Sequence, residues 1–234
     1  NMFLTKDNKI KWKWMAWGAV ITAALVLVGI CWLDKPLYLF LRNFDCLLFR
    51  CVFEKLFCAE MWIIVSAVVL LVFYIKKAAI EKPRIRGDKN KFSLLVFCKD
   101  GWNKVRNSYA IFVLTSVVAA SALGWFLKVF IGRARPVFYE ALGMTGFFPP
   151  SFEWAFNSMP SGHTVASFAG LVMLGLLAPR IKWFTWSLAI LVGVSRVCAG
   201  AHWPSDVVLG AFIGMAVADL TKAALKHHGA DIAK

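Results

Sequence analysis

Residues 160–178 read PSGHTVASFAGLVMLGLLA, a small polar cluster placed directly in front of an apolar run. Pro160 suits the start of a helix, because its missing N–H would have no partner there. The apolar run after His163 makes residues 160–178 a window long enough to cross a bilayer, which takes about 20 predominantly apolar residues. The stretch therefore predicts a membrane-spanning helix that begins at a polar mouth.

The rest of the chain has the same character. It contains 234 residues, 60% of them hydrophobic, which is too apolar for an ordinary soluble domain. No short apolar core with a small-residue cleavage site precedes the first span, so we expect that span to be retained. The apolar windows predict an all-α integral membrane bundle of six transmembrane helices in a single domain, residues 1–234. The expected spans are roughly 14–33, 57–75, 108–130, 160–178, 183–201 and 204–225.

The net charge of +14 is compatible with nucleic-acid binding, but its distribution favours a membrane protein. Ten of the 27 lysines and arginines lie in loop 76–107 and four precede the first span, whereas loop 131–159 contains two. Basic residues are retained on the cytoplasmic side of a membrane. We therefore expect no nucleic-acid partner, both termini in the cytoplasm, and loop 131–159 on the outer side. A bacterial inner membrane with a periplasmic site fits this topology. The apolar stretch 90–104 is either an interfacial helix or part of a basic linker.

The six cysteines match no common zinc-binding spacing, and we expect neither a metal nor a cofactor. Cys46, Cys51 and Cys58 fall close to the connection between the first two spans. If that connection faces an oxidising compartment, one disulfide among them is open. The oligomeric state is open as well.

Three stretches at the expected outer ends of the spans concentrate polar residues. They read KVFIGRARP at 128–136, PSGH at 160–163 and SRVCAGAHWPSD at 195–206. Ionisable residues at the edge of a span are costly and point to function by default. Lys128, Arg135 and Arg196 are three cations without a matching cluster of acids. A doubly charged anion such as phosphate would offset their repulsion. The alternative is that each one snorkels to lipid headgroups.

The two histidines suggest acid–base and nucleophilic chemistry. Ser161, Gly162 and His163 would occupy a first helical turn, whose free N–H groups favour an anion. A plain helix cap is the alternative. Asp206 would lie close enough to accept one ring N–H of His202 and leave the other nitrogen as a nucleophile. Because an isolated His–Asp pair is often a satisfied polar contact, the interpretation depends on the convergence of all three stretches.

Together the stretches resemble the signature of the type 2 phosphatidic-acid phosphatase superfamily, which reads Lys-x6-Arg-Pro, Pro-Ser-Gly-His and Ser-Arg-x5-His-x3-Asp. All spacings fit, and the six-helix layout covers nearly the whole chain. The resemblance implies a metal-independent phosphatase. It also implies that His202 attacks phosphorus to form a phosphohistidine, that Asp206 supports His202, and that His163 protonates the leaving oxygen. The phosphate-binding groups that it implies are Lys128, Arg135, Arg196, Ser161 and the Gly162 N–H.

The signature recognises the phosphate and leaves the tail unspecified. We therefore expect a membrane lipid phosphatase whose substrate is lipid A phosphate, phosphatidylglycerol phosphate, undecaprenyl diphosphate or phosphatidic acid. A phosphotransferase of the same family is the first alternative, and an anion transporter is the second. Loop 137–159 is either a lid that admits an acyl chain or a plain interfacial loop.

Residues outside the signature are given smaller roles. Arg133 is interpreted as a surface charge of its loop, with a second phosphate or sugar contact as the alternative. Gly210 and Gly214 predict a close helix-packing face on the last span. Asp219 is expected to pair with Lys222, one turn away.

Overall fold

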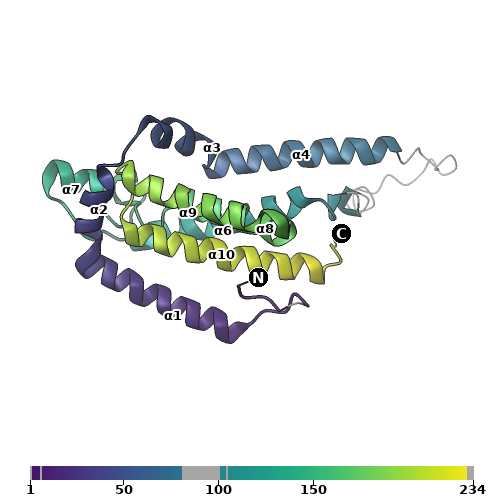
Figure 1. Cartoon of the computed structure of the whole chain (residues 1–234), viewed down its shortest axis with the longest axis horizontal. Coiled ribbons are helices and arrows are strands. Elements are labelled where there is room, and N and C mark those ends of the chain that lie inside the picture. Colours follow the sequence, from purple (N-terminus) through teal and green to yellow (C-terminus); the bar gives the residue numbers. More distant parts are fainter. Residues whose placement is uncertain (1, 6, 81–100, 104, 231–234) are drawn as a thin grey trace.

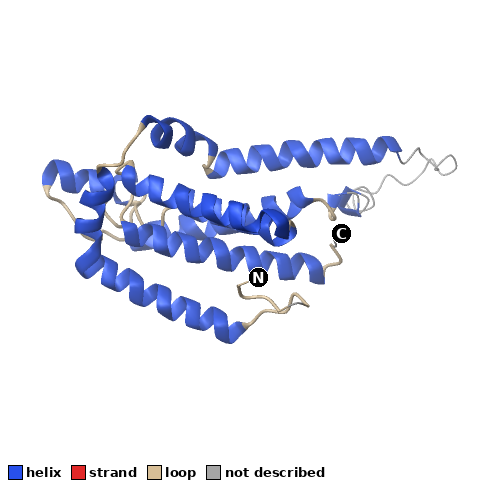
Figure 2. Ribbon diagram, in the orientation of Figure 1, coloured by secondary structure: helices blue, strands red, loops and turns tan. Residues whose placement is uncertain are grey.

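The computed structural model describes residues 2–5, 7–80, 101–103 and 105–230. This part of the chain is almost entirely helical and contains no strand, as Figure 2 shows. Two isolated antiparallel bridges are its only β contacts. The predicted all-α class is therefore confirmed. The stretch 90–104 lies mostly outside the described residues.

Within the described residues, five helices are long and apolar enough to cross a membrane. Their bounds are Trp12–Arg42, Ala59–Lys77, Tyr109–Ile131, Pro179–Cys198 and Pro204–His227. The first consists of α1 (Trp12–Val28), a π-helical turn (Gly29–Leu33) and α2 (Asp34–Arg42). The second lies within α4 (Ala59–Ile80), and the other three contain α6 (Tyr109–Ile131), α9 (Lys182–Cys198) and α10 (Pro204–His227). The remaining predicted span is α8 (Gly162–Leu177), which is apolar but 16 residues long. The expected count of six spans thus depends on α8.

Short elements connect these helices. A π-helical turn (Leu48–Phe53) and α3 (Glu54–Leu56) lead from α2 to α4, and α7 (Pro136–Leu142) follows α6. Single 3-10 turns occupy Trp154–Phe156 and Pro179–Ile181. The three cysteines of the first connection, Cys46, Cys51 and Cys58, are free thiols, so none of the disulfides left open by the sequence is formed.

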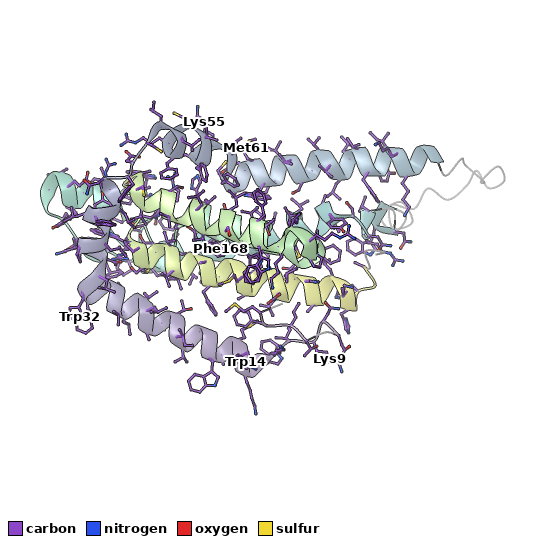
Figure 3. The ribbon with its side chains drawn as sticks, in the orientation of Figure 1. Lys9, Trp14, Trp32, Lys55, Met61 and Phe168 are labelled. Carbon is purple, nitrogen blue, oxygen red and sulfur yellow. The ribbon has the colours of Figure 1, made fainter. Side chains whose placement is uncertain are left out.

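Although it is short, α8 is the centre of the bundle. It packs against α6, α9 and α10, while α1 and α4 flank these helices on opposite sides (Figure 1). Val165, Ala169 and Met173 of α8 are completely buried. Phe168 lies among the bundle helices in Figure 3. A helix that is apolar all round is typical of such a buried position.

Two glycines of α10 allow its close approach to α8. A Cβ on Gly210 would lie 3.0 Å from the Ser161 carbonyl oxygen, and a Cβ on Gly214 would lie 2.6 Å from the Phe168 Cβ. A larger residue would push the two helices apart. The predicted packing face at these glycines is therefore confirmed.

The first helix presents aromatic side chains away from the bundle. Trp14 is 68% exposed and Trp32 is 72% exposed, and both project outward in Figure 3. Exposed indoles near the two ends of an apolar helix are typical of the membrane–water interfaces. The exposure of these rings fits an integral membrane protein.

The N-terminal segment and the end of α10 lie together, at the opposite end of the bundle from α2 and α7 (Figure 1). The Phe3 N–H donates to Asp219 Oδ2 at 2.8 Å, and Lys222 Nζ donates to the Leu176 carbonyl at 2.9 Å. Each of the two side chains thus makes its hydrogen bond elsewhere, and the expected Asp219–Lys222 pair is limited to the attraction between their charges. The last carbonyls of a helix have no intrahelical partner, and Lys222 satisfies one of those at the end of α8.

Candidate active site

The three signature stretches meet at the end of the bundle where α7 lies and α10 begins. A cavity of about 380 Å³ is found there, and six of the eight predicted site residues line it. These six are Lys128, Arg135, Gly162, His163, Arg196 and His202. Ser161 and Asp206 are fully buried and do not line the cavity. A larger cavity of about 1020 Å³, between residues 7–12 and the end of α10, contains none of the eight.

The start of α8 differs by two residues from the sequence prediction. Its N-cap is Ser161 and its first residue is Gly162, so Pro160 lies before the helix. The Ser161 Oγ accepts from Thr164 Oγ1 at 2.9 Å, and the Ser161 N–H donates to the Asp206 carbonyl at 3.1 Å. The Ser161 hydroxyl thus braces the helix start, whereas the resemblance implies a phosphate contact. The N–H groups of Gly162 and the next residue have no intrahelical partner, as in any first turn.

Two of the cations are held by backbone carbonyls. Lys128, in the last turn of α6, donates to the Asn157 carbonyl at 2.8 Å. Arg135, the N-cap of α7, donates from all three nitrogens to the carbonyls of Trp154, Ala201 and Asn157, at 2.9–3.2 Å. Burial lowers the pKa of Arg135 to about 10, so the guanidinium is still charged at neutral pH. These contacts orient both side chains without neutralising them.

Arg196 differs from the other two cations, because part of its guanidinium is unsatisfied. The residue is 4% exposed, and its Nε and Nη1 atoms have no hydrogen-bond partner among the described residues. The nearest carboxylate oxygen, Glu54 Oε2, lies 3.5 Å from Nη1. Buried donors without an acceptor are costly. An anion in the cavity would supply the missing acceptor.

His202 lies in the bend between α9 and α10 and is 3% exposed. Its Nδ1 lies 2.8 Å from the Ser158 carbonyl oxygen. Since a carbonyl can only accept, this contact places a proton on Nδ1 and leaves the lone pair on Nε2. Asp206 Oδ2 is 3.7 Å from Nδ1, beyond hydrogen-bonding distance. The expectation that Asp206 directly fixes the tautomer is corrected: the Ser158 carbonyl makes that contact.

Electrostatics keep the His202 ring neutral. Burial lowers its pKa well below the ordinary value of 6.5, and the charges of Arg135 and Lys128 act in the same direction. The carboxylate of Asp206 opposes them. A neutral imidazole with an available Nε2 is the form that can act as a nucleophile.

Asp206 is fully buried and saturated with donors. Its Oδ2 accepts from Ser158 Oγ at 2.5 Å and from the Trp203 N–H at 2.9 Å, and its Oδ1 accepts from Arg133 Nη1 at 2.6 Å. The Trp203 contact caps the start of α10. Ser158 therefore bridges Asp206 to His202, through its hydroxyl on one side and its carbonyl on the other.

Arg133 is not the surface charge expected from the sequence. Its side chain is 7% exposed, and its Nη2 lies 2.6 Å from Asp34 Oδ2 while its Nη1 reaches Asp206. Asp34 also accepts from the Ser205 N–H at 2.9 Å and the Ser205 Oγ at 2.6 Å. The prediction was wrong because the partner comes from the first helix, 99 residues away. One signal was present: Asp34 directly follows an apolar span, where a charge needs a partner.

His163 contacts a residue that sequence reasoning missed. Its Nε2 lies 2.9 Å from the carbonyl oxygen of Glu54, the first residue of α3. The Glu54 carboxylate faces Arg196, so this one residue touches both the second imidazole and the unsatisfied guanidinium. Nothing in the sequence near Glu54 distinguishes it from an ordinary loop charge.

Comparison with known proteins adds a family. The model of the PAP2 superfamily matches residues 109–228, just over half of the chain. The matched range contains all eight predicted site residues and excludes α1, α2 and α4.

Several characterised or solved proteins are similar to this chain. A lipid A 1-phosphatase of Rhizobium etli is 42% identical over 103 residues, which are 44% of each chain. A probable diacylglycerol pyrophosphate phosphatase 1 of Schizosaccharomyces pombe is 32% identical over 173 residues, covering 56% of this chain and 62% of that protein. The crystal structure of Aquifex aeolicus LpxE aligns with a TM-score of 0.40 and 22% identity, over 70% of this chain and 94% of that one. The matched residues thus span less than two thirds of the length of the Rhizobium etli and Schizosaccharomyces pombe proteins.

Proposed function

This chain belongs to the PAP2 superfamily, and on that premise we propose that it is an integral membrane phosphatase that hydrolyses a phosphate monoester or diphosphate of an envelope lipid. One observation carries the proposal. A single cavity is lined by three cations and two histidines, and the guanidinium of Arg196 has donors with no partner. Guanidinium groups match the oxygens of phosphate in geometry and charge.

The first chemical step is attack by His202 on phosphorus. The Nε2 lone pair forms the N–P bond while the bond from phosphorus to the leaving oxygen breaks, giving a phosphohistidine. The Ser158 carbonyl holds the Nδ1 proton and supports the charge that develops on the ring. Asp206 acts through Ser158 and by capping α10, so we assign it a positioning role.

His163 supplies a proton to the leaving oxygen. In the imidazolium form the Nε2–H donates to the Glu54 carbonyl, and the Nδ1–H is the proton that passes to the leaving oxygen, so His163 ends this step neutral. In the second step the Nδ1 of neutral His163 takes a proton from a water molecule, whose oxygen bonds to phosphorus while the N–P bond breaks. Phosphate is released and the lone pair returns to His202 Nε2. Lys128, Arg135 and Arg196, with the Gly162 N–H, hold the phosphoryl oxygens in both steps. No step requires a metal ion or a cofactor.

The tail of the substrate has its own path. A second cavity of about 280 Å³ lies between α4, α6 and α8 and shares Lys128, Gly162 and His163 with the first. Trp125 and Val165 contribute apolar surface to it. A lipid phosphate could place its head in the first cavity and its tail along the second. This arrangement supports a lipid substrate over a small soluble phosphate ester.

The distribution of charge supports the proposed cellular location. The basic residues concentrate in loop 76–107 and before α1, which favours the cytoplasm for those segments. The candidate site lies at the other end of the bundle from the N-terminal segment. A periplasmic site in a bacterial inner membrane satisfies both observations.

The proposal is tested by phosphate release from purified protein in detergent, in the presence of EDTA. The substrates are lipid A 1-phosphate, phosphatidylglycerol phosphate, undecaprenyl diphosphate and phosphatidic acid. We expect the wild type to act on at least one of them and His202→Ala to lose activity at least ~1000-fold. The exposed His228, changed to alanine, is the matched control. Full activity of His202→Ala would overturn the mechanism, and a strict requirement for added divalent metal would overturn its metal independence.

The same assay separates the alternatives. A phosphotransferase would transfer the phosphoryl group to an acceptor lipid, so products are compared with and without a candidate acceptor. An anion transporter would release no phosphate from any substrate and would move phosphate across vesicle membranes. The observed cavity favours chemistry, because both imidazoles line it.

A further inference from the structure

The connection between α2 and α4 forms one wall of the candidate site. Glu54, the first residue of α3, is a member of the cavity lining. The segment around it is anchored, because Phe53 is 7% exposed and its ring lies 5.6 Å from the Phe49 ring and 5.3 Å from the Phe57 ring. Phe57 in turn packs against the hydrophobic core. Glu54 is therefore held at the cavity by a packed segment.

Glu54 makes two different contacts there. Its backbone carbonyl receives the Nε2–H of His163 at 2.9 Å, and its Oε2 lies 3.5 Å from Arg196 Nη1. The second contact is an ion pair without a hydrogen bond, because Nη1 is still unsatisfied. The Glu54 side chain is half exposed, so its carboxylate can reach a bound molecule.

The position of His163 defines one side of the reaction. In the proposed mechanism His163 protonates the leaving oxygen, so the group attached to that oxygen must come to lie beside His163. The backbone carbonyl of Glu54 accepts a hydrogen bond from His163 Nε2, and Glu54 lines the same cavity. A leaving group in this cavity therefore meets the negative charge of the Glu54 carboxylate as well as the positive charges of the cations.

A carboxylate at that position distinguishes two chemical classes of leaving group. Hydroxyl groups of a sugar or a glycerol can donate hydrogen bonds to it. A second phosphate brings further negative charge, which a carboxylate a few ångströms away repels. Building on the proposed function, we infer that Glu54 selects the leaving group, favouring phosphate monoesters of hydroxylated headgroups and disfavouring diphosphates.

Several charges near Glu54 bear on this selection. Arg196, Lys128 and Arg135 line the same cavity and attract any anion, including a second phosphate. Lys128 and Arg135 are oriented by carbonyls of residues 154–157 and 201, whereas Arg196 faces Glu54 directly. Removal of the Glu54 charge would leave Arg196 without a nearby carboxylate and would remove the repulsion that a second phosphate meets in the cavity.

The test compares two substrates that share a tail, farnesyl phosphate and farnesyl diphosphate. The quantity compared is kcat/KM for the diphosphate divided by kcat/KM for the monophosphate. We expect Glu54→Gln to raise this ratio about tenfold. The effect is no larger because the Glu54 side chain is half exposed and solvent screens its charge. Glu54→Asp keeps the charge and should keep the wild-type ratio within about threefold. Glu153→Gln is the matched control, because Glu153 is an exposed acid on the loop that carries Trp154 and does not line the cavity. Its ratio should equal that of the wild type.

A binding measurement provides a readout that needs no turnover. Inorganic phosphate and pyrophosphate are titrated against each purified variant, and the dissociation constants are obtained from the shift in thermal unfolding. We expect Glu54→Gln to bind pyrophosphate about tenfold more tightly relative to phosphate than the wild type does.

The outcomes separate the two proposals. An active enzyme whose substrate ratio and pyrophosphate preference do not change in Glu54→Gln overturns the role of Glu54 and leaves the phosphatase intact. A wild type that hydrolyses none of the lipids overturns the phosphatase, and the pyrophosphate preference then decides on its own whether Glu54 selects against a second phosphate.

Discussion

Replacing Arg133 with methionine would strand two carboxylates inside the protein. Arg133 Nη1 lies 2.6 Å from Asp206 Oδ1, and Nη2 lies 2.6 Å from Asp34 Oδ2. The three side chains are all less than 10% exposed, so water cannot replace the guanidinium. Methionine has a similar length and no charge, and it keeps most of the packing while it removes both ion pairs.

The expected loss follows from the cost of an unpaired buried charge. Removing one partner of a buried ion pair costs about 3–5 kcal/mol. Asp34 retains the two Ser205 donors and Asp206 retains Ser158 Oγ and the Trp203 N–H, which favours the lower half of that range. Adding Asp34→Asn to Arg133→Met removes one of the stranded charges. We expect this second change to recover about 1–3 kcal/mol, so that the two changes are not additive.

The assay is equilibrium unfolding in mixed micelles with increasing SDS, followed by circular dichroism. Arg180→Met is the control, because Arg180 is exposed and a surface change is expected to stay within about 0.5 kcal/mol. A loss below about 1 kcal/mol in Arg133→Met would refute the network, and so would simple additivity with Asp34→Asn. Activity is measured in parallel, because a shifted Asp206 should lower kcat with little change in KM.

Three further predictions concern other parts of the molecule. Arg196→Lys keeps the positive charge but loses the planar set of donors. We expect kcat/KM for phosphate release to fall about 100-fold in this variant. A loss of less than tenfold would contradict direct binding of phosphate by Arg196. Burial lowers the pKa of His202, so the unfolded chain binds the proton first, and stability should fall as the pH decreases below 6.5. The free energy of unfolding should change by up to about 1.4 kcal/mol per pH unit. In the same SDS titration at pH 8 and pH 5.5, His202→Asn should lose less stability between the two pH values than the wild type does. An equal loss in both proteins would refute the assignment. Gly214→Ala would place a Cβ 2.6 Å from the Phe168 Cβ and should lower the free energy of unfolding by about 1–3 kcal/mol. Gly101→Ala is the control and should cost far less, because a Cβ there would meet no atom within 4 Å. Equal losses in the two variants would argue against tight packing of α8 and α10.

The sequence located most of the candidate site for a physical reason. Lys128 and Arg196 lie in the last turns of α6 and α9, and Gly162 and His163 lie in the first turn of α8. Consecutive spans run in opposite directions, so the end of one and the start of the next come to the same side of the membrane. Residues at those ends therefore share a cavity, as long as the spans are assigned correctly.

The supporting contacts could not be predicted in the same way. Asp34, Glu54 and Ser158 lie in connections or at the joint of two helices, where no hydrophobic period indicates which way a side chain points. Arg133 is two residues from Arg135, yet Arg133 pairs with acids and Arg135 with carbonyls. The direction of the backbone within the turn decides which partners each arginine side chain can reach. That direction cannot be predicted from the composition of the segment.

The length of the apolar runs and the placement of charges between them were sufficient to predict the helical class and the approximate positions of the long helices, because both depend on neighbours along the chain. The partner of each buried charge was decided by the folded chain, because Arg133 meets Asp34 across 99 residues and His163 meets Glu54 across 109. Burial makes the pairing of Arg133 obligatory, and the packing of α8 among its neighbours determines which groups are close enough to one another for such contacts.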